Sequence, residues 1–216
     1  QPGCIDEAFQ LVVHSKRDRI RSLTRANATV APREVRTSNR PVGRGCLIYS
    51  LIVTHPHGDH INGLPALRER YPEARVVIGP GAREFLAHPK TAAALVAEDR
   101  YMSEFLASQG TRPGRPPIDR PPSVDGATVV SDNETLDLGG LAIRFLHVGG
   151  HAIGNILVHV PGRSALMVSD SLGFRIPSVG FFPIFFTGYG DYMATIDRLA
   201  ALEPRILCLA HQGPLE

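Results

Sequence analysis

The stretch that most constrains the fold of this chain lies at Thr54 to His60, where three histidines and one aspartate fall within six residues. It follows a short apolar run, Leu47 to Val53, which is typical of a buried strand. Imidazole and carboxylate groups are the ligands that zinc and neighbouring borderline metals prefer. A strand gives such a loop a rigid base, and Pro56 and Gly58 let the backbone turn sharply between ligands. The sequence therefore predicts a metal site directly after a buried strand.

The run His55-Pro56-His57-Gly58-Asp59-His60 resembles the H-x-H-x-D-H signature of the metallo-β-lactamase superfamily. The later ligands of that superfamily follow in order: Gly150-His151 with Gly154-Asn155, then Ser169-Asp170 after an apolar run, then His211. The resemblance extends from about Leu47 to His211. It implies an α+β fold with α/β-type layers, the αβ/βα sandwich. Two facing mixed sheets would have helices outside and metals at one edge between them.

The same resemblance implies two metal positions. The first would be held by His55, His57 and His151, and the second by Asp59, His60 and His211, with the carboxylate of Asp170 bridging them. Neutral imidazoles leave the charge of the ions largely intact, while the carboxylates reduce repulsion between two dications roughly 3.5–4 Å apart. We expect two zinc ions per chain, with iron or manganese as alternatives.

The implied reaction is hydrolysis of a small molecule. A zinc ion can lower the pKa of water from about 16 to about 7, so that hydroxide attacks a carbonyl or similar electrophile. Asp59 would orient the attacking water as the catalytic carboxylate, and no serine or cysteine nucleophile is needed. Ser169, beside Asp170, is interpreted as structural.

Comparison with branches of the superfamily narrows the substrate. Asp170 argues against a true β-lactamase, because zinc β-lactamases have Cys or Ser at the equivalent position. Hydroxyacylglutathione hydrolases resemble all seven ligands but carry a helical C-terminal extension, whereas this sequence ends five residues after His211. Lactonases of acyl-homoserine lactones use a tyrosine near the site, for which Tyr189 or Tyr192 are candidates. Nucleases of the superfamily have extra domains or long insertions. We therefore expect a hydrolase of an ester, thioester or lactone.

Two hypotheses come from other functional classes. Persulfide dioxygenases resemble this fold and bind one iron through ligands equivalent to His55, His57 and His151, so the remaining ligands need not all bind metal. The second hypothesis is a metal-binding protein without catalysis. It is motivated by the N-terminal region, where we find no Asp-Thr-Gly-like turn of the kind superfamily members usually have. The intact set of seven ligands argues against it.

The length of 216 residues predicts a single domain spanning residues 1–216. Residues 1–46 form an atypical basic N-terminal region, with nine Lys or Arg and two acidic residues between Lys16 and Arg44. An atypical first sheet, a disordered or swapped arm, and an altered translation of an ordinary N-terminus are all compatible with it. Nucleic-acid binding by this arm is not expected, because interleaved aromatic residues and a glycine-rich pattern are lacking.

After the ligand motif, periodicity predicts a helix over residues 61–71 and helical structure over residues 82–109 with a break at Pro89. In the second segment the expected apolar face consists of Leu95, Met102, Phe105 and Leu106. Residues 111–123 contain five prolines, so they form a connector or a rim over the site rather than a helix or central strand. Short strands are expected over residues 75–78, 127–130, 134–138, 141–148, 155–160, 165–168 and 205–209. His147 and His159, inside two of them, are interpreted as structural or surface residues.

The segment Phe181 to Phe186 is the most apolar loop of the chain. It is compatible either with a place in the core or with a hydrophobic wall for substrate, for which Phe182, Phe185 and Tyr189 are the candidate residues. Asp191 is expected to cap a helix whose apolar stripe is Met193, Ile196, Leu199 and Leu202.

Composition excludes some other classes. Apolar content is 43% and charged content 20%, as in ordinary globular proteins. No apolar run reaches the roughly 18 residues of a membrane span. Cys4, Cys46 and Cys208 contain no C-x-x-C pair, which argues against a disulfide framework or thiolate site. We expect a small-molecule substrate, no membrane, no nucleic acid and a cytoplasmic location, although a start at Gln1 leaves a cleaved signal peptide open. The oligomeric state stays open.

Overall fold

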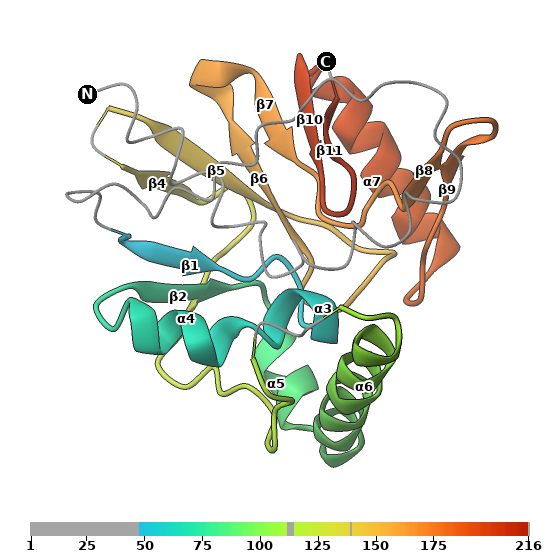
Figure 1. Ribbon diagram of the computed structural model, residues 1–216. Coiled ribbons are helices and arrows are strands. Elements are labelled where there is room, and N and C mark those ends of the chain that lie inside the picture. The colour runs from blue at the N-terminus through green and yellow to red at the C-terminus, as the bar shows by residue number, and fades with distance from the viewer. Residues whose placement is uncertain (1–47, 112–114, 139, 216) are drawn as a thin grey trace.

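The computed structural model describes residues 48–111, 115–138 and 140–215 (Figure 1). The expectations for residues 1–46, including the basic arm and two of the three cysteines, lie outside the described residues. No helix among the described residues is long and apolar enough to cross a membrane.

The smaller sheet carries the ligand motif at the end of its first strand. Its strands run in the order β1-β2-β3 and pair in parallel: β1 (Ser50–Ile52), β2 (Arg75–Ile78) and β3 (Thr128–Val129). The central strand β2 is buried on both faces, as strands inside parallel sheets usually are. Val76 and Ile78 pack on the helical side, whereas Val77 points toward the larger sheet. The predicted bounds of β2 are confirmed.

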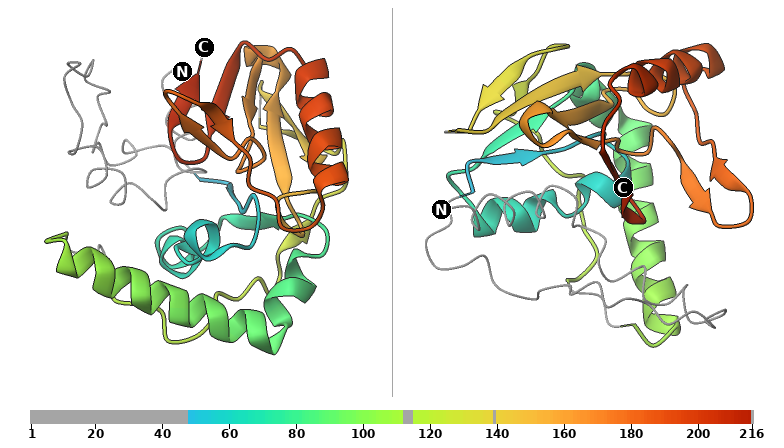
Figure 2. Two further views of the ribbon diagram at one scale, coloured as in Figure 1. Left: turned by 90° about the vertical axis from the view of Figure 1, so that its right-hand side faces the viewer. Right: turned by 90° about the horizontal axis from the view of Figure 1, so that it is seen from above.

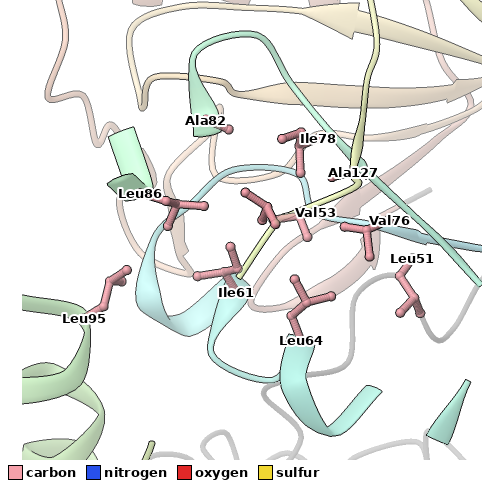
Figure 3. Packing of buried hydrophobic residues seen from close by; sticks show 11 residues of the cluster. Leu51, Val53, Ile61, Leu64, Val76, Ile78, Ala82, Leu86, Leu95 and Ala127 are labelled. Atoms are coloured by element: carbon pink, nitrogen blue, oxygen red, sulfur yellow. The ribbon is translucent and has the colours of Figure 1, made fainter. Parts of the chain in front are cut away.

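Two short helices connect β1 to β2 where the sequence predicted one helix over residues 61–71. They are α3 (Gly58–Ile61) and α4 (Leu64–Arg70). The first begins inside the ligand motif, so Asp59 and His60 lie on a helical turn rather than in a loop. The prediction of one continuous helix is wrong because Asn62 and Gly63 separate the two, and Pro65 favours a fresh helix start. Figure 3 shows Ile61 and Leu64 packed with residues of β1 and β2.

The predicted break at Pro89 is confirmed, giving α5 (Ala82–Ala87) and α6 (Pro89–Ser108). The predicted apolar face of α6 is largely wrong. Leu95 is buried, but Met102 and Leu106 are half-buried and Phe105 is 44% exposed. The reason is that the second half of this long helix extends away from the sheets (Figure 2). The described part of the proline-rich segment contains no helix or strand, and it is tied to α6 by a bidentate pair between Arg115 and Asp99 at 2.7 and 2.9 Å. These contacts favour a connector, rather than a rim over the site, as the role of residues 111–123.

The larger sheet is mixed and has the order β11-β10-β7-β6-β5-β4. Only β7 and β10 pair in parallel among these neighbours. The strands are β4 (Thr135–Asp137), β5 (Ala142–His147), β6 (Ile156–Val160), β7 (Ala165–Met167), β10 (Ile206–Leu209) and β11 (Gly213–Leu215), with a 3-10 turn η2 (Pro161–Arg163) after β6. Strand β11 was not predicted, because Gly213 and Pro214 are poor strand formers.

Successive side chains of these strands point to opposite faces of the larger sheet, and each face contributes to its own hydrophobic core. Phe145 and Val158 face the smaller sheet together with Val77, whereas Leu146 and Leu157 face the opposite side. There they pack under α7 (Tyr189–Ala201). The layers are therefore helices, smaller sheet, larger sheet and helix α7, as Figure 1 shows. The predicted αβ/βα sandwich is confirmed.

Helix α7 begins two residues before the predicted cap. Gly188 is its N-cap residue, and Asp191 lies in the first turn without capping it. The buried positions are Tyr192, Thr195 and Leu199, while Met193 is exposed. The predicted stripe is thus displaced at its start, because the first turn of α7 packs on the glycine loop after β5 rather than on a strand.

The apolar segment near residue 181 belongs to a hairpin, β8 (Phe174–Ile176) with β9 (Gly180–Phe182). The alternative of a core position is wrong, because Phe182 is 54% and Phe186 is 71% exposed. The hairpin projects from the sandwich beside α7 (Figure 2). Sequence periodicity could not reveal this, since apolar residues that face water carry the same pattern as buried ones.

Helix α7 approaches Gly150 so closely that a side chain there has no space. Gly150 has φ +89°, and a Cβ built on it would lie 2.3 Å from Cα of Tyr192. We expect Gly150→Ala to lower the free energy of unfolding by about 2 kcal/mol or more, because both the backbone conformation and the contact become strained. Gly162→Ala is the control, since nothing lies within 4 Å of its Cβ. Urea denaturation showing equal effects of both substitutions would contradict this packing.

Candidate metal centre

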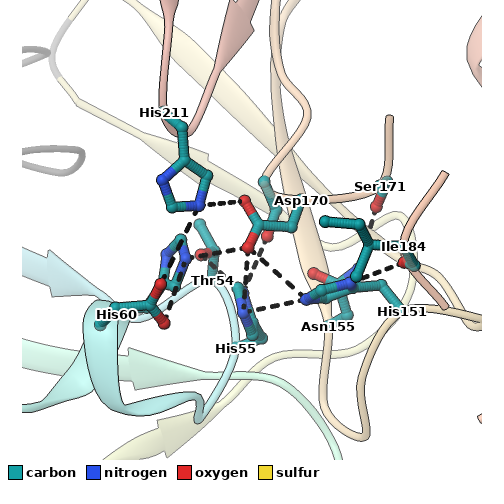
Figure 4. A network of polar contacts seen from close by, with 11 residues as sticks. Thr54, His55, His60, His151, Asn155, Asp170, Ser171, Ile184 and His211 are labelled. Atoms are coloured by element: carbon teal, nitrogen blue, oxygen red, sulfur yellow. Dashed lines mark hydrogen bonds and ion pairs between the residues drawn. The ribbon is translucent and has the colours of Figure 1, made fainter. Parts of the chain in front are cut away.

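The predicted ligands meet at one edge of the sandwich, between the two sheets. His55 and His57 follow β1, and α3 carries Asp59 and His60. The remaining three follow strands of the larger sheet: His151 after β5, Asp170 after β7 and His211 after β10. Figure 4 shows His55, His60, His151, Asp170 and His211 pointing toward one another. The fold thus brings together all seven residues that the resemblance implied as ligands.

The seven side chains form two groups that can each hold an ion. The ligand atoms of His55, His57 and His151 lie within 4.8 Å of one another, as do those of Asp59, His60, Asp170 and His211. Asp170 lies between the groups. One of its carboxylate oxygens is 3.1 Å from Nε2 of His60 and 3.6 Å from Nε2 of His151, and the other is 2.9 Å from Nε2 of His211. This is the position that a bridging ligand would need.

Hydrogen bonds outside the centre turn two imidazoles toward it. Nδ1 of His151 donates to the carbonyl oxygen of Ile184 at 2.9 Å, which fixes the tautomer because a carbonyl only accepts. The hydroxyl of Ser169, 2.9 Å from Nδ1 of His55, can accept from the same tautomer. With His55 in that tautomer, the two Nε2 atoms face each other at 3.3 Å with lone pairs and no proton between them. A cation relieves that repulsion, so the donor set fits a metal.

Burial keeps the imidazoles in the form that binds metal. It lowers the pKa of His55 and His151, and together with the neighbouring His151 it lowers the pKa of His57 to about 4. Burial alone would raise the pKa of Asp170, but hydrogen bonds from His211 and His60 outweigh it and hold this pKa well below its usual range. Near neutral pH, the centre therefore offers neutral nitrogen donors of the first group and an ionised carboxylate.

The sequence did not reveal several residues that support the ligands. Ser169 was interpreted as structural. Its hydroxyl contacts Nδ1 of His55, so the structural role it can play is to orient that imidazole. Nδ2 of Asn155 donates to the hydroxyl of Ser171 at 2.9 Å, which ties the His151 loop to the Asp170 loop. Asn62, directly after α3, lies 3.3 Å from Asp99 and joins α3 to α6. Ser169, Ser171 and Asn62 were marked only by their nearness to predicted ligands, and Asn155 only by its place in the quoted motif.

Two phenylalanine rings contact the ligand imidazoles. The ring of Phe186 lies 5.6 Å from the rings of both His57 and His151, and the ring of Phe174 lies 4.9 Å from that of His211. Neither was among the predicted substrate residues.

The predicted substrate residues lie in the same segment, all exposed: Phe182 on β9, Phe185 after it and Tyr189 at the start of α7. Phe185 contacts Tyr189 and the buried Tyr192.

His147 is exposed, and His159 contacts Arg144 at 3.0 Å. Both histidines lie outside the two ligand groups.

The fold and the ligand arrangement define a metallo-beta-lactamase type of protein. Residues 50–211 match the sequence profile of the metallo-beta-lactamase superfamily. The chain therefore belongs to the metallo-beta-lactamase superfamily, as the motif indicated.

Individual relatives are similar over most of the chain. A hydroxyacylglutathione hydrolase from Ruegeria pomeroyi is 31% identical over 171 residues, covering 78% of this chain and 50% of the relative. The acyl-coenzyme A thioesterase MBLAC2 from Bos taurus is 26% identical, covering 71% of this chain and 51% of the relative. The crystal structure of an archaeal superfamily protein from Sulfolobus tokodaii has 26% identity and a TM-score of 0.60, covering 79% of this chain and 64% of that one. The chain thus spans about half the length of the curated relatives named here.

The lowered histidine pKa values predict how stability depends on pH. In the unfolded chain His57 has a pKa of about 6.5, against about 4 in the fold, so the unfolded state binds more protons between these values. We expect the stability of metal-free protein to be fully present above about pH 6.5 and to fall as the pH decreases toward 4. Urea denaturation with chelator at pH 7.5 and 4.5 measures it. His57→Gln should show a smaller decrease, and an unchanged decrease would contradict the assignment.

Removing the hydroxyl beside His55 tests the orienting hydrogen bond. We expect Ser169→Ala to weaken metal binding about 10- to 100-fold, as is typical when the partner of a ligating histidine is lost. Competition with a chelator measures the affinity. Ser164→Ala, at another positive-φ serine outside the two ligand groups, is the control. Equal affinities of the two variants would show that Ser169 does not position His55.

Proposed function

We propose that this chain is a metal-dependent hydrolase with a dinuclear centre, zinc being the expected metal, acting on an ester, thioester or lactone. The observation that carries this proposal is the convergence of seven ligand atoms in two groups with Asp170 between them. The outward hydrogen bonds of His55 and His151 support it, because they leave Nε2 free for metal.

In this proposal His55, His57 and His151 would hold one ion, Asp59, His60 and His211 would hold the other, and Asp170 would bridge them. When bound there, two metal ions would supply a lowered pKa of water and polarisation of a carbonyl oxygen. The two groups differ in burial: His55 and His151 are buried, whereas the ligands from α3 are half-buried. Substrate and water would therefore approach from the side of α3 and the hairpin.

Asp59 is the proposed catalytic carboxylate. Its side chain is 21% exposed, with one oxygen 3.8 Å from Nε2 of His60 and the other 4.0 Å from Nε2 of His211. A water molecule can thus reach Asp59 beside the second group. The role assigned to Asp59 is to accept a hydrogen bond from that water and orient it toward the substrate carbonyl.

The named relatives guide the choice of the first substrates. One is named a hydroxyacylglutathione hydrolase and another an acyl-coenzyme A thioesterase. Thioesters are therefore the first class to test, followed by simple esters and lactones. A dioxygenase with a single iron would need only the first ligand group, so the compactness of the second group favours two ions.

Substitution of ligands tests the proposed centre. We expect His57→Ala and Asp170→Ala each to lose most of the bound metal and at least about 100-fold in hydrolysis while remaining folded, because ligand loss should exceed the 10- to 100-fold typical of supporting residues. Elemental analysis, a thioester panel and circular dichroism measure these effects. His147→Ala, an exposed histidine outside the centre, is the control. Full activity in either ligand variant would contradict the dinuclear scheme, and about one iron per wild-type chain with oxygen consumption would favour the dioxygenase.

A further inference from the structure

The segment between the ligands Asp170 and His211 exposes an unusual amount of apolar surface. Residues 176–188 contain no charged side chain. Ile176, Phe181, Phe182 and Phe185 are exposed, and Val179 and Phe186 are the most exposed at 71% each. Large apolar patches on a protein surface mark sites of interaction. The position of this patch beside the predicted metal ligands indicates what kind of molecule it binds.

The patch begins at the metal ligands themselves. On one side, the ring of Phe186 contacts His57 and His151 of the first group. On the other side, Phe174 contacts His211 of the second group. Phe174 pairs with Phe182 across the hairpin, so both side chains point to the same face. An apolar surface thus continues from the ligands outward along the hairpin.

Hydrogen bonds hold this surface in place. The side-chain amide of Gln212, next to the ligand His211, both donates to and accepts from the backbone of Arg175 at 2.6 Å. At the other end, the backbone N–H groups of Phe186 and Thr187 donate to the carbonyl oxygen of Gly150 at 2.9 Å. The hairpin is therefore anchored to two ligand loops, which is what a preformed binding surface requires.

We propose that the hairpin and the segment after it bind a linear apolar acyl chain of the substrate. This inference rests on the proposed hydrolase function. The thioester carbonyl lies at the metal centre, and the acyl chain extends over Phe174, Phe182 and Phe186. In the reaction, water adds its oxygen to the acyl carbon, the C–S bond breaks, and the thiol leaves with a proton, giving a carboxylic acid without any redox change.

Contact of the aromatic rings with the ligand imidazoles favours this occupant over a lipid surface or a second copy of the chain. A contact with a membrane or with another protein would need only exposed apolar residues, and these could lie on any part of the surface. It would not need Phe174 and Phe186 against the ligands of both groups. An acyl chain whose carbonyl sits at the metals would lie beside these two rings, because they contact imidazoles of both groups.

Chain-length dependence tests the proposal. The probes are N-acetylcysteamine thioesters with acyl chains of two to twelve carbons, and the measurement is thiol release as kcat/KM. We expect kcat/KM to rise about twofold per methylene up to octanoyl, below the roughly fourfold that complete burial of a methylene would give. Phe186→Ala and Phe174→Ala should each reduce the ratio of octanoyl to acetyl kcat/KM about tenfold, with unchanged metal content.

Phe105→Ala is the matched control, because Phe105 is a 44% exposed phenylalanine on α6 that stacks on Tyr101 rather than on a ligand. Its chain-length profile should equal that of the wild type. Hydrolysis with a flat profile, or a profile that the Phe174 and Phe186 variants leave unchanged, overturns this inference while the hydrolase stands. Hydrolysis of no thioester, ester or lactone overturns the proposed function and this inference with it.

Two further measurements identify other occupants. Co-sedimentation with phosphatidylcholine vesicles tests a lipid surface, and sedimentation velocity tests self-association. If Phe186→Ala abolishes either one while the chain-length profile is flat, the hairpin is a lipid or protein contact and the proposal is overturned. Absence of both, with a rising profile in the wild type, supports the acyl-chain surface.

Discussion

The structure depends on how the buried carboxylate of Asp170 is compensated. A carboxylate removed from water costs several kcal/mol unless it is paired and hydrogen-bonded. Here His60 and His211 lie 3.1 and 2.9 Å from its two oxygens. His60 comes from α3 beside the smaller sheet, and His211 follows β10 of the larger sheet. The compensation therefore requires both halves of the sandwich to meet at this edge, so the centre and the packing of the layers depend on each other.

The backbone conformations of two residues at the centre also help to hold the predicted ligands in position. Gly150 before the ligand His151 has φ +89°, and Ser169 before Asp170 has φ +52°. Glycine adopts a positive φ readily, whereas a serine keeps one only where surrounding contacts hold it. Tyr192 packs against Gly150, and the Ser169 hydroxyl lies against His55. The residue before each of these two predicted ligands thus has a positive φ, and its neighbours fix the direction in which the following side chain points.

The resemblance of short motifs to the superfamily implied both the sandwich and the seven candidate ligands, and the structure confirms the sandwich and brings the seven side chains together. A compact motif after an apolar run is readable without knowing the fold, and the turn residues Gly79-Pro80-Gly81 marked the observed end of β2. The exposed hairpin was not predictable, because an exposed Phe186 looks identical to a core phenylalanine in a sequence. Phe174 is a single residue whose contact with His211 depends on the hairpin register. The division of one expected helix follows from Asn62, Gly63 and Pro65, which the apolar periodicity of the segment does not register.

The segment after β9 both orients the imidazole of His151 and exposes an apolar surface. The carbonyl oxygen of Ile184 accepts the hydrogen bond that fixes the tautomer of His151, and two residues later the Phe186 ring contacts the same imidazole. One short stretch of backbone therefore orients a ligand and presents the apolar surface. A bound apolar group that displaced Phe186 would also disturb the Ile184 carbonyl. Because the backbone N–H of Phe186 is anchored to Gly150, such a displacement is resisted, and the surface and the ligand geometry stay fixed together.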